Sequence, residues 1–121
     1  MNFAQLGVIF CFLSVAAGAF GSHALRSRLT PEMLQVFEIG ARYQMYHGLA
    51  LLFVAWLVER NPQNTFATYA GWLFTVGILI FSGSLYLLSI TGERWLGAIT
   101  PIGGTAFLAG WLLLLLSSLK R

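Results

Sequence analysis

Four long apolar runs fill almost the whole chain. They cover roughly residues 3–20, 43–58, 66–90 and 96–119. The first, third and fourth runs are near or above the ~18 residues that a helix needs to cross a bilayer. Charged residues make up only 9% of the 121 residues, against about 25% in soluble domains, so a soluble fold could not bury this much apolar surface. The sequence therefore predicts a small integral membrane protein.

Capping residues divide the runs into helices. Residues 30–32 read Thr-Pro-Glu, which is typical of a helix start with Thr as the N-cap and Pro in the first turn. Asn64 or Thr65 is expected to cap the third helix, and Gly92 to close it. Residues 100–101 repeat the Thr-Pro pattern, so the regular part of the fourth helix is predicted to begin there.

These signals predict a single four-helix transmembrane domain over residues 1–121. The expected helices cover about residues 3–25, 31–60, 65–91 and 100–119. The fold class is all-α, with four transmembrane helices in an antiparallel bundle. Residues 31–42 alternate apolar and polar faces, so they are predicted to form an amphipathic extension before the second apolar helix.

Composition excludes several classes of site. Apart from Arg42, the basic residues lie at or beyond the ends of the runs, Lys120 and Arg121 among them. This placement suits lipid headgroups, and no basic patch for a nucleic acid is visible. The single cysteine, Cys11, excludes an intrachain disulfide or a cysteine-based metal site. Aspartate does not occur in the chain, and no nucleophile and base are paired, so we expect no catalytic residues, no metal site, no cofactor and no enzyme activity.

Polar side chains gather where the first and second helices are expected to meet, and ionisable groups at membrane depth are rare and often functional. Gln44 lies three residues before His47, so the two can share a helix face. A shared cluster is predicted in which the imidazole of His23 can bond to a backbone carbonyl or to Gln44. The members of this predicted polar cluster are His23, Arg42, Tyr43, Gln44, Tyr46 and His47.

Three interpretations of the polar cluster are open. The first is a structural lock, in which the polar groups hydrogen-bond one another and hold the first two helices together. The second is a path for protons or a small molecule from His23 and His47 to Ser82 and Ser84. The third makes the two histidines haem or metal ligands, although two nitrogens are a small ligand set.

Small residues predict where helices approach one another closely, because glycine and serine allow backbones to come together in membranes. Serines in such helices also bond to carbonyl groups one turn back. The residues assigned to helix packing on this basis are Gly18, Gly21, Ser82, Gly83, Ser84, Gly103 and Gly104.

Several motifs together resemble a known family. Residues 18–25 read Gly-Ala-Phe-Gly-Ser-His-Ala-Leu, residues 43–47 Tyr-Gln-Met-Tyr-His, and residues 100–104 Thr-Pro-Ile-Gly-Gly. In this combination the chain resembles the YgdD and YwdK bacterial membrane proteins, the family of domain of unknown function 423, to which small mitochondrial transmembrane proteins are related. The resemblance implies a four-helix protein of the bacterial plasma (inner) membrane without an established activity.

The function predicted from the sequence is that of a non-enzymatic accessory, assembly or structural membrane protein. The alternative is a small carrier or a proton- or ion-conducting protein that uses His23 and His47, and a haem- or metal-binding protein is a further alternative. Its expected partners are the lipid bilayer and either another membrane protein or a second copy of the chain. The connecting loops are short, so a partner would be met within the bilayer or along the amphipathic segment.

Overall fold

Helices make up the protein, whose computed structural model describes residues 1–119. No strand occurs within these residues. The helical elements join end to end into four rods. Lys120 and Arg121, predicted to lie at a membrane interface, are outside the described residues.

The first rod contains three elements and the second rod one. The first consists of α1 (Phe3–Val15), η1 (Ala16–Gly21) and α2 (Ser22–Leu25). The second is α3 (Pro31–Arg60), a continuous helix of 30 residues. The predicted amphipathic segment is therefore the first part of the same helix that carries the second apolar run.

The third and fourth rods are also composite. The third consists of α4 (Thr65–Gly77), η2 (Ile78–Ser82) and α5 (Gly83–Thr91), and the fourth of η3 (Arg94–Ala98) and α6 (Thr100–Leu119). The elements η1 and η2 are π-helical turns, in which hydrogen bonds join residues five apart.

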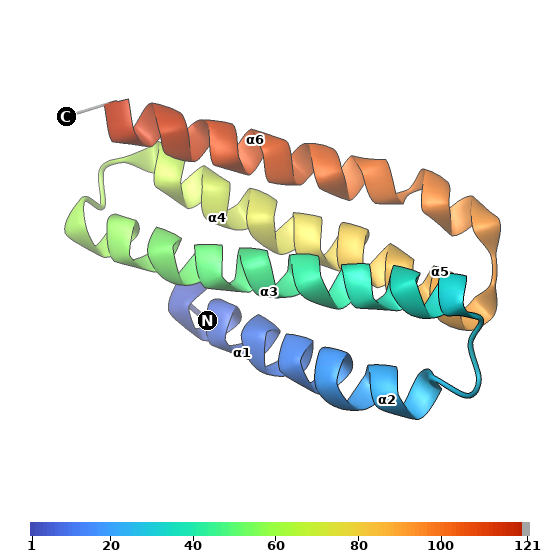
Figure 1. Cartoon of the computed structure of the whole chain (residues 1–121). Coiled ribbons are helices and arrows are strands. Elements are labelled where there is room, and N and C mark those ends of the chain that lie inside the picture. Colours follow the sequence, from blue (N-terminus) through green and yellow to red (C-terminus); the bar gives the residue numbers. More distant parts are fainter. Residues whose placement is uncertain (120–121) are drawn as a thin grey trace.

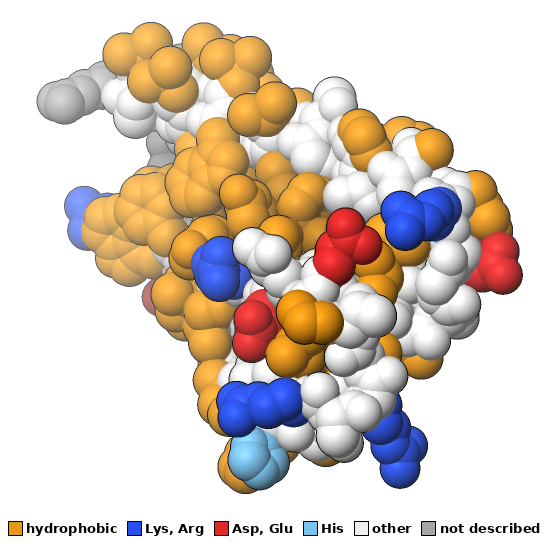
Figure 2. Space-filling model, turned by 45° about the vertical axis from the view of Figure 1, so that its right-hand side comes forward, with side chains coloured by type: hydrophobic (Ala, Val, Ile, Leu, Met, Phe, Trp, Pro, Cys, Tyr) orange, Lys and Arg blue, Asp and Glu red, His pale blue; other side chains and the backbone are white. Residues whose placement is uncertain are grey.

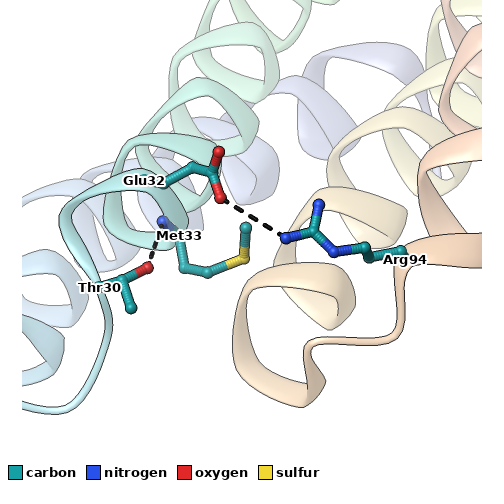
Figure 3. A network of polar contacts seen from close by, with 4 residues as sticks. All are labelled: Thr30, Glu32, Met33 and Arg94. Atoms are coloured by element: carbon teal, nitrogen blue, oxygen red, sulfur yellow. Dashed lines mark hydrogen bonds and ion pairs between the residues drawn. The ribbon is translucent and has the colours of Figure 1, made fainter.

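Polar side chains cap the rods where the sequence predicts. The Thr30 hydroxyl accepts from the backbone N–H of Met33 at 3.1 Å, beside the ion pair of Glu32 with Arg94 (Figure 3). Asn64 caps α4, and Gly92 ends α5 in the left-handed conformation at φ 75°. The regular part of the fourth helix begins at Thr100, as predicted, and the 3-10 turn η3 precedes it in the same rod.

The four rods lie side by side along most of their length (Figure 1). The helix α1 packs chiefly against α3, α3 also packs against α4 and α5, and α4 packs against α6. The core at the centre of this arrangement is apolar. It is formed by Phe10, Ala50, Leu51, Val54, Ala70, Phe74, Ile78, Phe107 and Leu114.

Glycines set the distance between neighbouring rods at two crossings. A Cβ on Gly103 would lie 2.5 Å from the backbone nitrogen of Phe81, so no larger residue fits while α6 lies against η2. At the crossing of α1 and α3, a Cβ on Gly7 would lie 2.7 Å from the carbonyl oxygen of Gly48. Both contacts bring backbones close together, as in membrane helix pairs.

Three of the four rods are long and apolar enough to cross a membrane: Phe3–Leu25, Thr65–Thr91 and Arg94–Leu119. The helix α3 is longer but carries polar side chains along its length, among them Gln44 and His47. An all-helical fold with four long helices, three of them candidate membrane spans, therefore agrees with the sequence analysis.

Charged and apolar surfaces are separated. Figure 2 brings forward the end of the molecule that carries α2, the start of α3 and η3, and red and blue side chains gather there. The exposed charged residues of these segments include Arg28, Glu32 and Arg94. The flanks expose large apolar side chains, such as Phe12 at 71% and Leu108 at 73%. A surface of this kind suits lipid along the sides and headgroups at the end.

Candidate functional site

One face of α3 carries the buried polar residues at the centre of the protein. Gly40, Gln44 and His47 follow one another at spacings of four and three residues, which places them on the same side of a helix. Leu51 and Val54 continue this face into the apolar core and are 0% exposed. The polar residues thus extend the core toward the end of the protein that bears Arg28 and Glu32.

Gln44 joins α3 to two other helices. Its side-chain amide donates to the carbonyl oxygen of Phe10 on α1 at 2.9 Å. Its own carbonyl oxygen accepts a hydrogen bond from the Tyr86 hydroxyl on α5 at 2.7 Å. The residue is 5% exposed, so these bonds replace the water that both ends of the amide would otherwise need.

His47 joins α3 to α6. The indole N–H of Trp111 donates to Nε2 of His47 at 3.0 Å, and Nδ1 of His47 lies 2.8 Å from the carbonyl oxygen of Tyr43. Because an indole can only donate, Nε2 must be the unprotonated nitrogen. The imidazole is therefore neutral, carries its proton on Nδ1 and donates it to Tyr43.

Aromatic rings enclose the same imidazole. The ring of Phe107 stacks on it with the centroids 3.6 Å apart and the planes 7° from parallel. Phe74 lies at 5.3 Å and Trp111 at 5.8 Å, both at steep angles. His47 is 4% exposed, so the rings leave water little access to the nitrogens.

Two serines bond to carbonyl groups of α3 that lie just before Gln44. Ser14 on α1 donates to the carbonyl oxygen of Ala41, and Ser82, the last residue of η2, donates to that of Gly40 at 2.7 Å. These carbonyl groups are neighbours along α3 but receive their bonds from two different rods. The first and third rods are thus both fastened to α3 at one level.

The structure separates the members of the predicted polar cluster. Gln44 and His47 lie inside, whereas His23 and Arg42 are exposed, and Tyr46 is 49% exposed. Of the two partners considered for His23, Gln44 is not the one, since the Gln44 side chain bonds to Phe10 and Tyr86.

Tyr43 takes part in the site through its backbone. It supplies the carbonyl oxygen for His47, while its ring, 37% exposed, lies against Tyr46 and Phe81. Such a role cannot be read from the residue type, because every residue carries a carbonyl group.

The partners on the other rods were missed by sequence reasoning. Tyr86 and Trp111 supply the donors to Gln44 and His47. Their residue types are the one signal that could have found them, because buried Tyr and Trp usually find a hydrogen-bond partner. The sequence does not show which partner each of them takes, because they lie 42 and 64 residues away from the groups they bond.

The predicted packing residues differ in how closely they approach their neighbours. A Cβ on Gly21 would lie 3.1 Å from the Phe37 ring, whereas one on Gly18 or Gly104 would lie in ordinary contact at 3.9 Å. A Cβ on Gly83 would meet no atom within 4 Å. Ser84, beside it, bonds to the hydroxyl of Thr100 and so links α5 to α6.

The two histidines lie in different surroundings, one buried and one exposed. Within residues 1–119, no three His, Cys, Asp or Glu residues come together as a metal site would require. Both nitrogens of His47 are bound to protein groups, and His23 lies exposed on α2. What the site does physically is to tie α3 to each of the other three rods.

Comparisons with known proteins give full-length relatives. The family described as "protein of unknown function (DUF423)" matches residues 17–104. The UPF0382 membrane protein SH2409 of Staphylococcus haemolyticus is 46% identical over 118 residues, which cover 98% of this chain and 95% of that protein. The UPF0382 membrane protein YwdK of Bacillus subtilis is 45% identical over 118 residues, with 98% and 96% covered. No solved structure gives a significant match.

Proposed function

The chain belongs to the DUF423 family of membrane proteins, and from this premise we propose that it is a structural or accessory protein of the bacterial plasma membrane. In this role its buried polar groups hold four transmembrane helices together and perform no chemistry. The single observation that carries the proposal is the imidazole of His47, whose two nitrogens are both bonded to protein groups beneath a stacked ring.

The proposal includes a fourth span, formed by α3, in one antiparallel domain. Its 30 residues have a length of about 45 Å, which exceeds the ~30 Å hydrocarbon thickness of a bilayer. Gln44 and His47 face the interior, and the opposite side of α3 presents apolar residues such as Leu49 and Phe53, each about half exposed. The short links between rods favour neighbours of opposite direction.

Burial of the polar residues supports a lock rather than a conducting path. A path would keep its polar groups accessible to water along a line through the membrane. Gln44, His47 and Ser82 are 5%, 4% and 1% exposed, and each is hydrogen-bonded to another rod. Since their bonds already satisfy them, a passing proton or solute would have to break the contacts that hold the rods together.

The surface supports the accessory role. Within residues 1–119 the connections between rods are only a few residues long, so they offer no soluble surface of their own for binding a partner. The α1 flank exposes large apolar side chains, such as Val8 at 58% and Phe12 at 71%. A protein partner or a second copy would therefore meet this protein within the bilayer.

Proton flux into liposomes tests the proposal against the carrier alternative. The purified full chain is reconstituted with a pH-sensitive dye inside, and a pH step is applied across the membrane with valinomycin and potassium to balance charge. We expect the wild type and His47→Gln to match protein-free liposomes. The structural role would be overturned if the wild type conducted protons above that background and His47→Gln did not.

A further inference from the structure

The seam between α1 and α3 carries two hollows on one side of the protein. The first is lined in part by Ser14, Glu38, Arg42 and Tyr46 and has a volume of about 380 Å³. The second is lined by apolar side chains that include Phe12 and has a volume of about 490 Å³. Both volumes fall within the ~300–1,000 Å³ range of small-molecule sites.

The two hollows lie next to one another along the seam. On α3, Tyr46 lines the first hollow and Leu49, one helical turn later, lines the second. On the first rod the second hollow runs alongside the first, since Cys11 and Phe20 line the second and Ser14 lines the first. Together they form a groove, here called the seam groove, with a polar part and an apolar part. This division matches the two parts of a lipid molecule.

Arg42 in the polar part has no protein anion bound to it. Within residues 1–119, the ion pair closer than 4.0 Å is that of Glu32 with Arg94, at 3.9 Å. Arg42 is exposed, so its guanidinium group is free to donate to an oxyanion. A phosphate fits the forked donors of an arginine and can accept two hydrogen bonds from them.

Glu38 lies one turn before Arg42 and lines the same polar part. Glu and Arg four residues apart can form an ion pair along a helix, but no such contact within 4.0 Å joins these two in the structure. A ligand with a positive group beside its phosphate would complement both side chains, whereas a purely anionic ligand would face the carboxylate without a partner for it.

The depth of the polar part also suits a headgroup. Gly18 lines it and lies seven residues before Leu25, the end of the first rod, which corresponds to about 10 Å along the helix. The rod itself has 23 residues, or about 35 Å, slightly more than the ~30 Å hydrocarbon layer. The long side chain of Arg42 can extend from this depth toward the headgroup level.

We propose that the seam groove binds one phospholipid whose headgroup carries both a phosphate and a primary amine, such as phosphatidylethanolamine. The phosphate lies against Arg42, the amine against Glu38, and one acyl chain follows the apolar part past Phe12 and Leu49. The proposal rests on the four-span topology of the proposed function. If the lipid selectivity failed, the structural role of the hydrogen bonds around His47 would still stand.

Native mass spectrometry of the full chain tests the site directly. The protein is purified, stripped of lipid and titrated with phosphatidylethanolamine, phosphatidylglycerol or phosphatidylcholine of identical acyl chains. We expect one tightly retained phosphatidylethanolamine and weaker binding of the other two lipids. Equal retention of all three would overturn the proposal, and preference for phosphatidylglycerol would overturn the role of Glu38.

Variants assign the two charges. Arg42→Gln should weaken retention about fivefold, which corresponds to the ~1 kcal/mol that one arginine contributes near a membrane surface. Arg42→Lys should restore part of the affinity, and Glu38→Gln should remove the preference for the amine. The matched control is Arg60→Gln on the same helix, because Arg60 lies over the Trp56 ring outside the seam groove. Loss of binding in the control equal to that in Arg42→Gln would overturn the site.

Photocrosslinking tests the apolar part independently of the charges. Phosphatidylethanolamine with a diazirine on one acyl chain is bound to the wild type in liposomes and activated with light. Peptide mapping is expected to find adducts at the residues that line the apolar part, which include Cys11, Phe12, Val15, Leu49 and Leu52. Adducts spread evenly over the exposed flanks of α4 and α6 would overturn the proposed path of the chain.

Discussion

The indole of Trp111 on α6 donates a hydrogen bond to Nε2 of His47 on α3, although 64 residues separate the two in the chain. The bond fixes the imidazole in its neutral form with the proton on Nδ1. It also links the fourth rod to α3, whereas Gln44 and two serines link the first and third. These buried polar side chains therefore tie the helices to one another.

The tautomer of His47 is the first testable prediction. Nitrogen-15 spectra of the protein with labelled histidine should show the proton of His47 on Nδ1 at neutral pH, because Nε2 accepts from Trp111. His23, which is exposed, serves as the internal reference for a histidine in contact with solvent. A proton on Nε2 of His47 would rule out the bond to Trp111.

Trp111→Phe should destabilise the protein by about 1 kcal/mol, because it removes the donor to His47 while keeping an aromatic ring. Trp72→Phe is the matched control, since Trp72 is 53% exposed and packs edge-on against Phe3. Thermal unfolding in detergent measures both. Equal stability of the two variants would mean that the bond contributes nothing to folding.

Gln44 and Tyr86 should be energetically coupled, because the Tyr86 hydroxyl donates to the Gln44 side chain at 2.7 Å. We expect Gln44→Leu and Tyr86→Phe each to cost about 1 kcal/mol, with a coupling energy of ~0.6 kcal/mol, the average for such bonds in membranes. A double-mutant cycle on the free energy of unfolding gives this coupling. Strict additivity would show that the two side chains act separately.

Gly103→Ala and Gly104→Ala should differ sharply although the residues are adjacent. The new Cβ at position 103 would lie 2.5 Å from the Phe81 backbone, and the one at position 104 would lie 3.9 Å from the Phe81 ring. We expect the first variant to lose about 1–3 kcal/mol of stability, as overpacked cores do, and the second to stay near the wild type. Guanidine or heat titration in detergent compares them, and similar stabilities would place α6 farther from η2.

The all-helical fold could be predicted from the sequence because its signals are local. The lengths of the apolar runs and caps such as Thr30 and Asn64 depend on neighbouring residues only. The Thr100-Pro101 pattern is another such signal, since α6 begins at Thr100 as predicted. The sequence analysis left residues 94–98 outside the fourth helix, whereas they form the 3-10 turn η3, which carries the fourth rod back to Arg94.

The candidate site was only partly predictable. Gln44 and His47 are polar and share a helix face, which indicates that both need hydrogen-bond partners. Which groups become those partners depends on how the rods pack. His23 and His47 share only their residue type. His23 is exposed on α2, whereas His47 is buried and bonds to Trp111 on α6. The π-helical turns η1 and η2 also could not be predicted. Their backbone hydrogen bonds join residues five apart, where an α-helix joins residues four apart, and no residue pattern here marks the change.

The stability of His47→Ala relative to His23→Ala tests the structural role most directly. Both variants remove an imidazole, but only that of His47 is bonded to other groups and stacked on Phe107. Thermal unfolding of the purified chain in detergent should show a loss of about 1–2 kcal/mol for His47→Ala and no change for His23→Ala. Equal stability of the wild type and both variants would contradict the lock, and with it the central claim that the buried polar groups hold the helices together.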